Sequence, residues 1–223
     1  MAEFIVTEAF GGLGEAGEAR VFEAVKAAYA GDEVLGFWRY PLVTQETVRE
    51  PDILVADPEL GLIVIEVKSL PLDVIAGVTG RRWDLARPYY GKAHLNPYEQ
   101  ARKQAHVLGE LTVRRGNLPQ LATRAIVALP LITREDWDAR FGHLLSDVPM
   151  LFADQLTPAK LRLALERTPP VRYGSPLDDE AWLRAGTLTS RHSTASVYRS
   201  PTCQGRALTA LPCCSGRPAT PAR

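Results

Sequence analysis

The sequence predicts an α/β fold, a sandwich in which helices flank a mixed β-sheet. Short apolar runs of strand length alternate with longer segments in which apolar residues recur at helical spacing, and that alternation is typical of a sheet covered by helices. Two of the runs, 52–56 and 62–68, are separated only by a turn containing Pro and Gly, which predicts an antiparallel hairpin. A helical segment then crosses over to the run 122–129, so the sheet is mixed.

The first half of the chain is predicted to hold one helix and five extended segments. After a flexible, glycine-rich start at 11–14, residues 15–30 have the apolar spacing of a helix, and Gly31 ends it. Pro41 ends the first extended segment. The extended segments are 34–40, 52–56, 62–68, 73–77 and 81–85, with a turn at Gly80 between the last two.

The second half is predicted to hold three helices and two strands. Asn96 suits a helix N-cap and Pro97 suits the first helical position, so a helix is expected from there to about Val113. The run 122–129 is a strongly apolar strand. The remaining elements are a helix from the N-cap Thr133 to Phe141, a last strand at 148–152, and a helix at 157–166 that Pro169 and Pro170 end.

The composition changes abruptly at Gly186. Residues 1–185 are predicted to form one domain, with its core at about 10–155 and a C-terminal helical extension. Residues 186–223 contain no Asp or Glu, carry five arginines and all three cysteines, and lack a periodic apolar run. We expect this tail to be disordered. An out-of-frame or truncated end would have the same composition.

Charge and composition exclude several classes of protein. The formal net charge of the chain is zero, but residues 1–185 carry 21 basic against 26 acidic side chains, unlike an obligate nucleic-acid binder. No secretory signal and no run of about 18–20 apolar residues is present, so we expect a cytoplasmic protein with no membrane partner. A cysteine-free body excludes a disulfide framework, and the adjacent Cys213 and Cys214 argue against zinc.

Two acids and a lysine carry the strongest chemical signal. Because strand side chains alternate between faces, Glu66 and Lys68 point to the same side, at the end of a run that is otherwise apolar. Charged groups in such a strand are costly unless they pair, bind a metal or reach solvent. Counting back from the turn places Asp52 opposite residues 66–67. The three side chains are therefore predicted to converge at one end of the sheet.

This set of residues suits magnesium-dependent phosphodiester hydrolysis. Two carboxylates, a backbone carbonyl and waters form a typical Mg²⁺ site, so Asp52 and Glu66 are predicted as metal ligands. The metal would stabilise charge on the phosphate and lower the pKa of a bound water. Lys68 would hold or activate that water. The alternative, for Glu66 and Lys68 taken alone, is an ordinary ion pair on a half-exposed strand, which is worth little.

The order and spacing of these motifs resemble those of the NERD (nuclease-related) domain, a branch of the PD-(D/E)XK nuclease superfamily. The resemblance spans about residues 10–130. The motifs that carry it are Gly17-Glu18 with Val21-Phe22, Pro51-Asp52-Ile53-Leu54-Val55, Ile65-Glu66-Val67-Lys68, Gly80-Arg81-Arg82-Trp83 and Asn96-Pro97-Tyr98-Glu99-Gln100.

The resemblance implies a restriction-endonuclease-like three-layer sandwich with a metal-dependent nuclease site. By match, Glu18 and Gln100 join Asp52, Glu66 and Lys68 as catalytic residues, and Gln100 would orient the lysine or the water. From spacing alone, Glu18 would be a partner of its own helix dipole and Gln100 a surface residue. Such domains are often joined to helicases or other DNA-processing modules, so a partner of that kind is expected.

A basic and aromatic segment surrounds the last of these motifs. Its alternation of cations and aromatic rings suits phosphate contact and base stacking on single strands. The alternative is that Trp83 packs in the core, which we favour for this residue, and that the arginines are solvated, which stays open. The candidate nucleic-acid-binding residues are Arg81, Arg82, Lys92, Arg102 and Lys103, interleaved with Trp83, Tyr89, Tyr90 and Tyr98.

The predicted function is therefore a Mg²⁺- or Mn²⁺-dependent nuclease that hydrolyses DNA, in DNA repair, DNA processing or defence. The alternative is a non-catalytic module on the same fold that binds nucleic acid or a partner protein. RNA stays open as a substrate beside DNA, and exonuclease beside endonuclease action.

Overall fold

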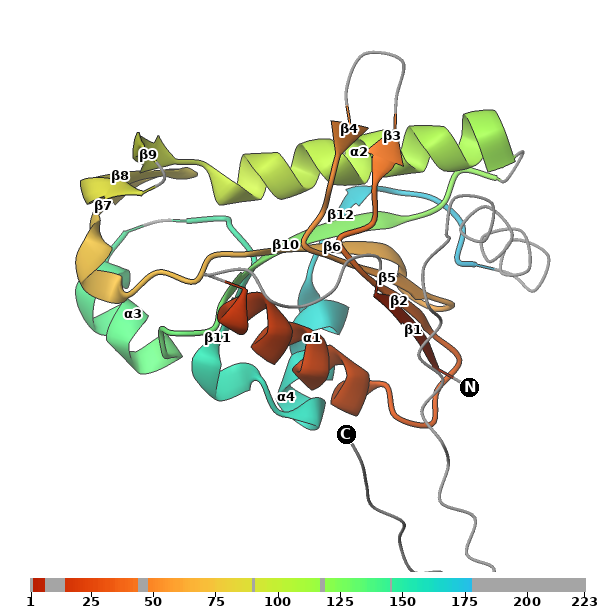
Figure 1. The fold of residues 1–223 in the computed structure, drawn as a ribbon, viewed down its shortest axis with the longest axis horizontal. Helices are drawn as coiled ribbons and strands as arrows, with labels where there is room; N and C mark the ends of the chain where they lie inside the picture. The colour runs from red at the N-terminus through yellow and green to blue at the C-terminus, as the bar shows by residue number, and fades with distance from the viewer. Residues whose placement is uncertain are drawn as a thin grey trace, which may run out of the picture.

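A seven-stranded mixed β-sheet runs through the centre of the molecule (Figure 1). The computed structural model describes residues 2–6, 15–43, 48–89, 91–116, 119–144 and 146–177. The glycine-rich start, Tyr90 and the tail 186–223 lie outside these residues. The strands follow the order β1-β2-β5-β6-β10-β11, with β12 paired to β10. Their bounds are β1 Glu3–Val6, β2 Leu35–Trp38, β5 Ile53–Asp57, β6 Gly61–Val67, β10 Thr123–Leu129, β11 Met150–Phe152 and β12 Pro170–Arg172.

Helices cover both faces of this sheet, so the sandwich has three layers. Helices α1 (Ala16–Ala28) and α4 (Pro158–Arg167) pack together on one face, and α2 (Pro97–Gly116) lies along the other (Figure 1). Strand side chains alternate, so each strand supplies two apolar cores, with Ile65 facing α1 and Val64 facing α2. The predicted α/β sandwich is confirmed. Among the described helices, none combines the length and the apolar character needed to cross a membrane.

The β5–β6 hairpin occupies the middle of the sheet. Ile53 lies opposite Ile65 in an antiparallel ladder, as the turn between the strands predicts. Gly61 has a φ of +82°, and a Cβ there would lie 2.2 Å from the Ala122 carbonyl oxygen, so only glycine fits this turn. Strand β6 pairs on its other side with β10, in parallel, after the crossover through α2. The strand that carries Glu66 is therefore covered on both edges and both faces.

A smaller antiparallel sheet lies at the N-terminal end of α2 (Figure 1). Trp83 of this sheet is 1% exposed and packs against Trp137 of α3 (Arg134–Phe141), with ring centroids 5.5 Å apart. The prediction that Trp83 belongs to the core is confirmed. The strands of this sheet are β7 Ile75–Thr79, β8 Arg82–Tyr89 and β9 Lys92–Leu95, and the remaining short elements are the pair β3 Leu42–Val43 and β4 Val48–Arg49 and the 3₁₀ turns Leu72–Val74 and Ala153–Gln155.

Sequence patterns locate the long elements to within a few residues but miss the short ones. Strands β1, β3, β4, β9 and β12 are too short or too polar to be recognised from their own sequence. The prediction that 148–152 is the last strand is wrong, because β12 follows it and pairs antiparallel with β10. Pro170, which we interpreted as a helix stop, is also the first residue of β12, a position where a missing N–H is tolerated.

Candidate active site

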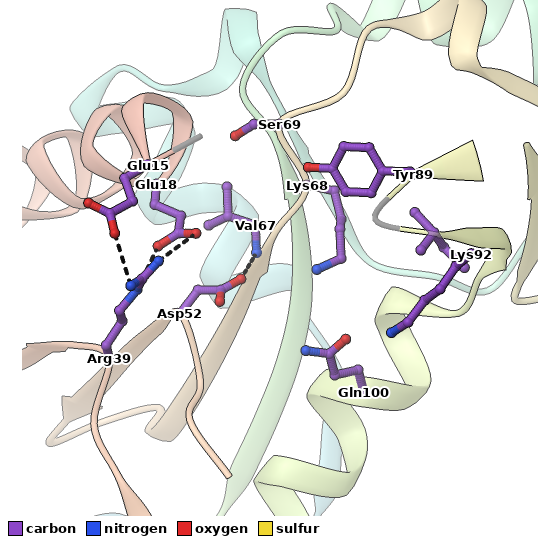
Figure 2. Close-up of a pocket in the computed structure, with 11 residues that line it drawn as sticks. Glu15, Glu18, Arg39, Asp52, Val67, Lys68, Ser69, Tyr89, Lys92 and Gln100 are labelled. Atoms are coloured by element: carbon purple, nitrogen blue, oxygen red, sulfur yellow. Dashed lines mark hydrogen bonds and ion pairs between the residues drawn. The ribbon is translucent and has the colours of Figure 1, made fainter. Parts of the chain in front are cut away.

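A cavity of about 350 Å³ opens between the β5–β6 hairpin, helix α1 and the small sheet (Figure 2). Four of the five predicted catalytic residues line it, and the fifth, Glu66, is fully buried next to two of them. Most of the lining side chains are polar or charged. The lining residues are Glu15, Glu18, Arg39, Asp52, Val67, Lys68, Ser69, Tyr89, Lys92, Leu95 and Gln100.

Asp52 reaches this cavity because of the hairpin register. It stands immediately before β5, and since Ile53 faces Ile65, its side chain extends toward the end of β6. The backbone N–H of Val67 donates a hydrogen bond of 2.7 Å to Asp52 Oδ2 (Figure 2). The predicted position of Asp52 opposite residues 66–67 is confirmed.

Glu66 is a carboxylate buried in the central strand. Its exposed fraction is 0%, and its Oε1 accepts a hydrogen bond from Lys68 Nζ. Its second oxygen, Oε2, has no hydrogen-bond partner among the described residues. A buried oxygen without a partner costs free energy, so it marks a place where a further group would be stabilising.

The charges of Asp52, Glu66 and Lys68 influence one another. Burial, and then the nearby Asp52 carboxylate, raise the pKa of Glu66 from 4.5 to about 7, although Lys68 opposes the change. Burial also raises the pKa of Asp52, against the attraction of Lys68. Burial lowers the pKa of Lys68, but Glu66 and Asp52 outweigh it and the result is a raised pKa. The three groups therefore form one interacting set, as predicted.

Glu18 approaches the cavity from the first turn of α1. Its carboxylate accepts a hydrogen bond of 3.2 Å from Arg39 Nε, and Arg39 Nη1 pairs with Glu15 at 3.0 Å (Figure 2). Burial and the Asp52 charge raise the pKa of Glu18, against the effect of Arg39. The structure thus brings Glu18 close enough to Asp52 for the two charges to interact.

Gln100 and Lys92 lie on the opposite side of the cavity from Glu18 (Figure 2). Gln100 belongs to the first turn of α2, where its backbone N–H donates to the Asn96 carbonyl at 3.1 Å. Tyr89 ends β8 and Lys92 begins β9, so the small sheet supplies this wall. The Asn96-Pro97 helix start therefore determines where Gln100 lies.

The carboxylates fit a divalent cation in part. Asp52 and Glu66 offer oxygen donors of the type that Mg²⁺ and Mn²⁺ prefer, and the unpaired Glu66 Oε2 would gain a partner. Among the described residues, however, no three His, Cys, Asp or Glu side chains are grouped closely enough to hold a metal ion. A cation here would need main-chain, water or substrate oxygens as further ligands, which is common for Mg²⁺.

The predicted nucleic-acid-binding residues divide into two groups. Arg81 pairs with Glu99 at 2.7 Å and with Asp147 at 2.5 Å, Arg102 pairs with Glu99 at 2.8 Å, and Arg82 pairs with Asp84 at 2.9 Å. Lys92 and Lys103 are exposed, and Lys92 lines the cavity. The three arginines are thus paired with acids of the small sheet, of α2 and of the segment before β11, and Lys92 is the one of the five that lines the cavity.

Sequence patterns did not indicate Glu15, Arg39, Ser69 or Leu95 as residues of the cavity. Arg39 had one recognisable signal, because it is a charged residue directly after the apolar strand that ends in Trp38. Its position beside Glu15 and Glu18 depends on how α1 packs against the end of β2, which no local pattern indicates.

A mixed sheet between helices, with acids and a lysine at the ends of paired strands, is consistent with a nuclease-like α/β sandwich. The chain belongs to the nuclease-related domain (NERD) family, whose model matches residues 13–130. This match covers the hairpin, the small sheet, α2 and β10. No curated protein and no solved structure matches the chain significantly.

Proposed function

We propose that this protein is a metal-dependent nuclease that hydrolyses phosphodiester bonds in DNA. The observation that carries the proposal is the fully buried Glu66 carboxylate, with one unpaired oxygen, beside Asp52 and Lys68. Acids whose pKa values are shifted by burial and by a specific charged neighbour, at the edge of a cavity, are candidates for a functional site. In an ordinary exposed ion pair, Glu66 would be accessible to solvent, whereas here it is fully buried.

The chemistry needs a nucleophile, charge neutralisation and a leaving group. Hydrolysis forms a bond between a water oxygen and phosphorus, while the bond from phosphorus to one bridging oxygen breaks and that oxygen takes up a proton. When bound by Asp52 and Glu66, Mg²⁺ or Mn²⁺ would supply Lewis acidity to the phosphate oxygens. Of this chain's own residues, the Lys68 ammonium would hold the attacking water and offset the negative charge of the transition state.

The other cavity residues would orient the reacting groups. Gln100, from α2, would hold Lys68 or the water in place, and Glu18, from α1, would accept a hydrogen bond from the water. Lys92 and Tyr89 lie where a strand entering the cavity would pass, and would contact its phosphate and base.

The proposal also includes a partner protein, a cellular compartment and a biological process. The body of the protein is acidic overall, so DNA would be delivered through a partner, such as a helicase or other DNA-processing protein, rather than by long-range attraction. We propose a cytoplasmic role in DNA repair, DNA processing or defence.

A second candidate is a binding module with a vestigial site. The ion pair between Lys68 and Glu66, and the lack of a three-residue metal cluster among the described residues, favour it. Such a module would bind DNA or a partner protein without metal and without cleavage.

The test is a cleavage assay on end-labelled single- and double-stranded DNA, with Mg²⁺, with Mn²⁺ or with EDTA. The wild type is expected to cut only with metal, and Asp52→Ala to lower the rate by about 100-fold or more. The matched control is Asp73→Ala, which removes an exposed acid away from the cavity. Equal rates for the wild type and Asp52→Ala would end the nuclease proposal, and DNA binding in EDTA together with no cleavage in Mg²⁺ or in Mn²⁺ would favour the binding module.

A further inference from the structure

Arg39 lies between the end of β2, helix α1 and Asp52, and the proposed hydrolysis assigns it no role. It directly follows β2 and lines the cavity on the side of α1 (Figure 2). Its guanidinium pairs with Glu15 at 3.0 Å and with Glu18 at 3.2 Å. Its backbone N–H donates to the Asp52 carbonyl at 3.0 Å. One residue therefore contacts both the helix that carries Glu18 and the residue predicted to hold the metal.

The backbone of Arg39 is in an unusual conformation. Its φ is +52°, in the left-handed region, and among the described residues no other non-glycine residue has a positive φ. A non-glycine residue adopts this region at a cost, and such strain tends to be kept where the side chain has a function. Glycine would adopt this conformation at a lower cost. The presence of arginine therefore indicates that its side chain has a function here.

The charges around Arg39 explain what that side chain does. Glu18 and Asp52 are both acidic and near each other, and their repulsion would drive the Glu18 side chain out toward solvent. The side chains of Glu15, Glu18 and Arg39 are only 17%, 15% and 25% exposed, so solvent does not screen them fully. A guanidinium can hold carboxylates through several N–H groups in fixed directions.

We propose that Arg39 is a positioning residue that holds the Glu18 carboxylate at the cavity beside Asp52. This inference rests on the proposed function, because it assigns Arg39 a role in a metal-dependent site. In this role Arg39 would act through Glu18 rather than by contact with the metal or the substrate. The proposal therefore predicts that loss of Arg39 weakens metal binding. Loss of its positive charge alone would have the opposite effect and would tighten the binding of a divalent metal.

The first test is Mn²⁺ binding without DNA, measured by titration calorimetry. Arg39→Ala and Glu18→Gln are each expected to weaken Mn²⁺ binding by about 10-fold, and the double variant by no more than either alone. Arg20→Ala is the matched control, since Arg20 also anchors α1, through the Pro130 carbonyl at 2.7 Å, and forms no ion pair with Glu18 in the described part of the chain. Tighter or unchanged binding in Arg39→Ala would overturn the proposal, as would additive losses in the double variant.

The second test separates positioning from folding and from the nuclease proposal. Arg39→Gly removes the side chain and also relieves the positive φ, so its melting temperature is expected to stay close to that of the wild type while Mn²⁺ binding weakens. Arg39→Lys keeps the charge without the guanidinium geometry and is expected to bind Mn²⁺ as weakly as Arg39→Ala. Full recovery with lysine would overturn the proposal.

Cleavage rates then distinguish the two claims. If the wild type binds Mn²⁺ but cuts no DNA, the nuclease proposal fails and the Mn²⁺ comparison still decides the role of Arg39. If the wild type cuts DNA and Arg39→Ala cuts equally fast, the positioning role of Arg39 is rejected and the nuclease proposal stands. Absence of Mn²⁺ binding by the wild type would overturn both.

Discussion

Glu66 is the most deeply buried acid of the candidate active site. Burial of a charged carboxylate costs free energy. The pKa of Glu66 rises to about 7 because burial and the nearby Asp52 carboxylate disfavour its charged form. Without metal, folded protein therefore holds a proton on Glu66 more tightly than the unfolded chain does. The contribution of Glu66 to the free energy of unfolding therefore falls as pH rises from about 4.5 to about 7, where the folded state gives up that proton.

Glu66→Gln tests this cost directly. The amide cannot ionise, so the variant should gain stability relative to the wild type as pH rises from 5 to 8, by about 1–3 kcal/mol in EDTA. Urea unfolding at both pH values measures the difference. If the difference in free energy of unfolding between the variant and the wild type is the same at both pH values, the pKa of Glu66 is not raised.

Residue patterns located the acids and the lysine but not their neighbours. The relative positions of Asp52, Glu66 and Lys68 were predictable because strand alternation and one short hairpin determine them, and the three residues lie no more than sixteen positions apart in the sequence. Arg39 was not, because its role comes from a positive φ and from a helix packed against the end of β2. The resemblance to a nuclease family, rather than spacing, indicated Glu18 and Gln100, and both line the cavity.

At the scale of elements, the approach of α1 to the β6 end decides where Glu18 lies. Gly17 permits this approach, since a Cβ there would lie 1.8 Å from Ser69 Oγ and 3.0 Å from Pro130 Cγ. Helix α1 therefore sits nearer to the sheet than any side chain at this position would allow.

Gly17→Ala is expected to push α1 away from the sheet and to destabilise the protein by about 1–3 kcal/mol. Because Glu18 is the next residue, Mn²⁺ affinity should fall as well. Gly77→Ala is the control, because a Cβ on that β7 glycine would meet no atom within 4 Å. Thermal unfolding and calorimetry check both effects, and equal behaviour of the two variants would contradict the close packing of α1.

The elements that the sequence located well are those with strong local signals. The hairpin turn at Gly61, the helix start at Asn96-Pro97 and the Thr133 cap, whose Oγ1 accepts from the Asp136 N–H, all lie where they were predicted. The short strands β1, β9 and β12 depend on tertiary neighbours, because an isolated strand of three or four residues has no stability of its own.

At the scale of the whole molecule, the described residues supply two apolar cores, one on each face of the central sheet, and helices cover both faces. From the composition of residues 186–223, which lack Asp, Glu and a periodic apolar run, we expect no contribution to either core.

A variant that ends at residue 185 is therefore expected to unfold at the same temperature as the full chain and to bind Mn²⁺ equally well. The tail carries five arginines and no acids, so DNA affinity at low salt provides the control for a purely electrostatic contribution. A lower melting temperature or weaker Mn²⁺ binding would show that the tail belongs to the domain.

Asp52 and Glu66 are proposed to form a metal-dependent active site. The most direct measurement is anomalous X-ray scattering from crystals soaked in Mn²⁺. We predict one strong peak within coordination distance of Asp52 and of Glu66 Oε2, absent from crystals of Asp52→Asn. A site that stays empty at saturating Mn²⁺, with Lys68 still paired to Glu66, would contradict the claim.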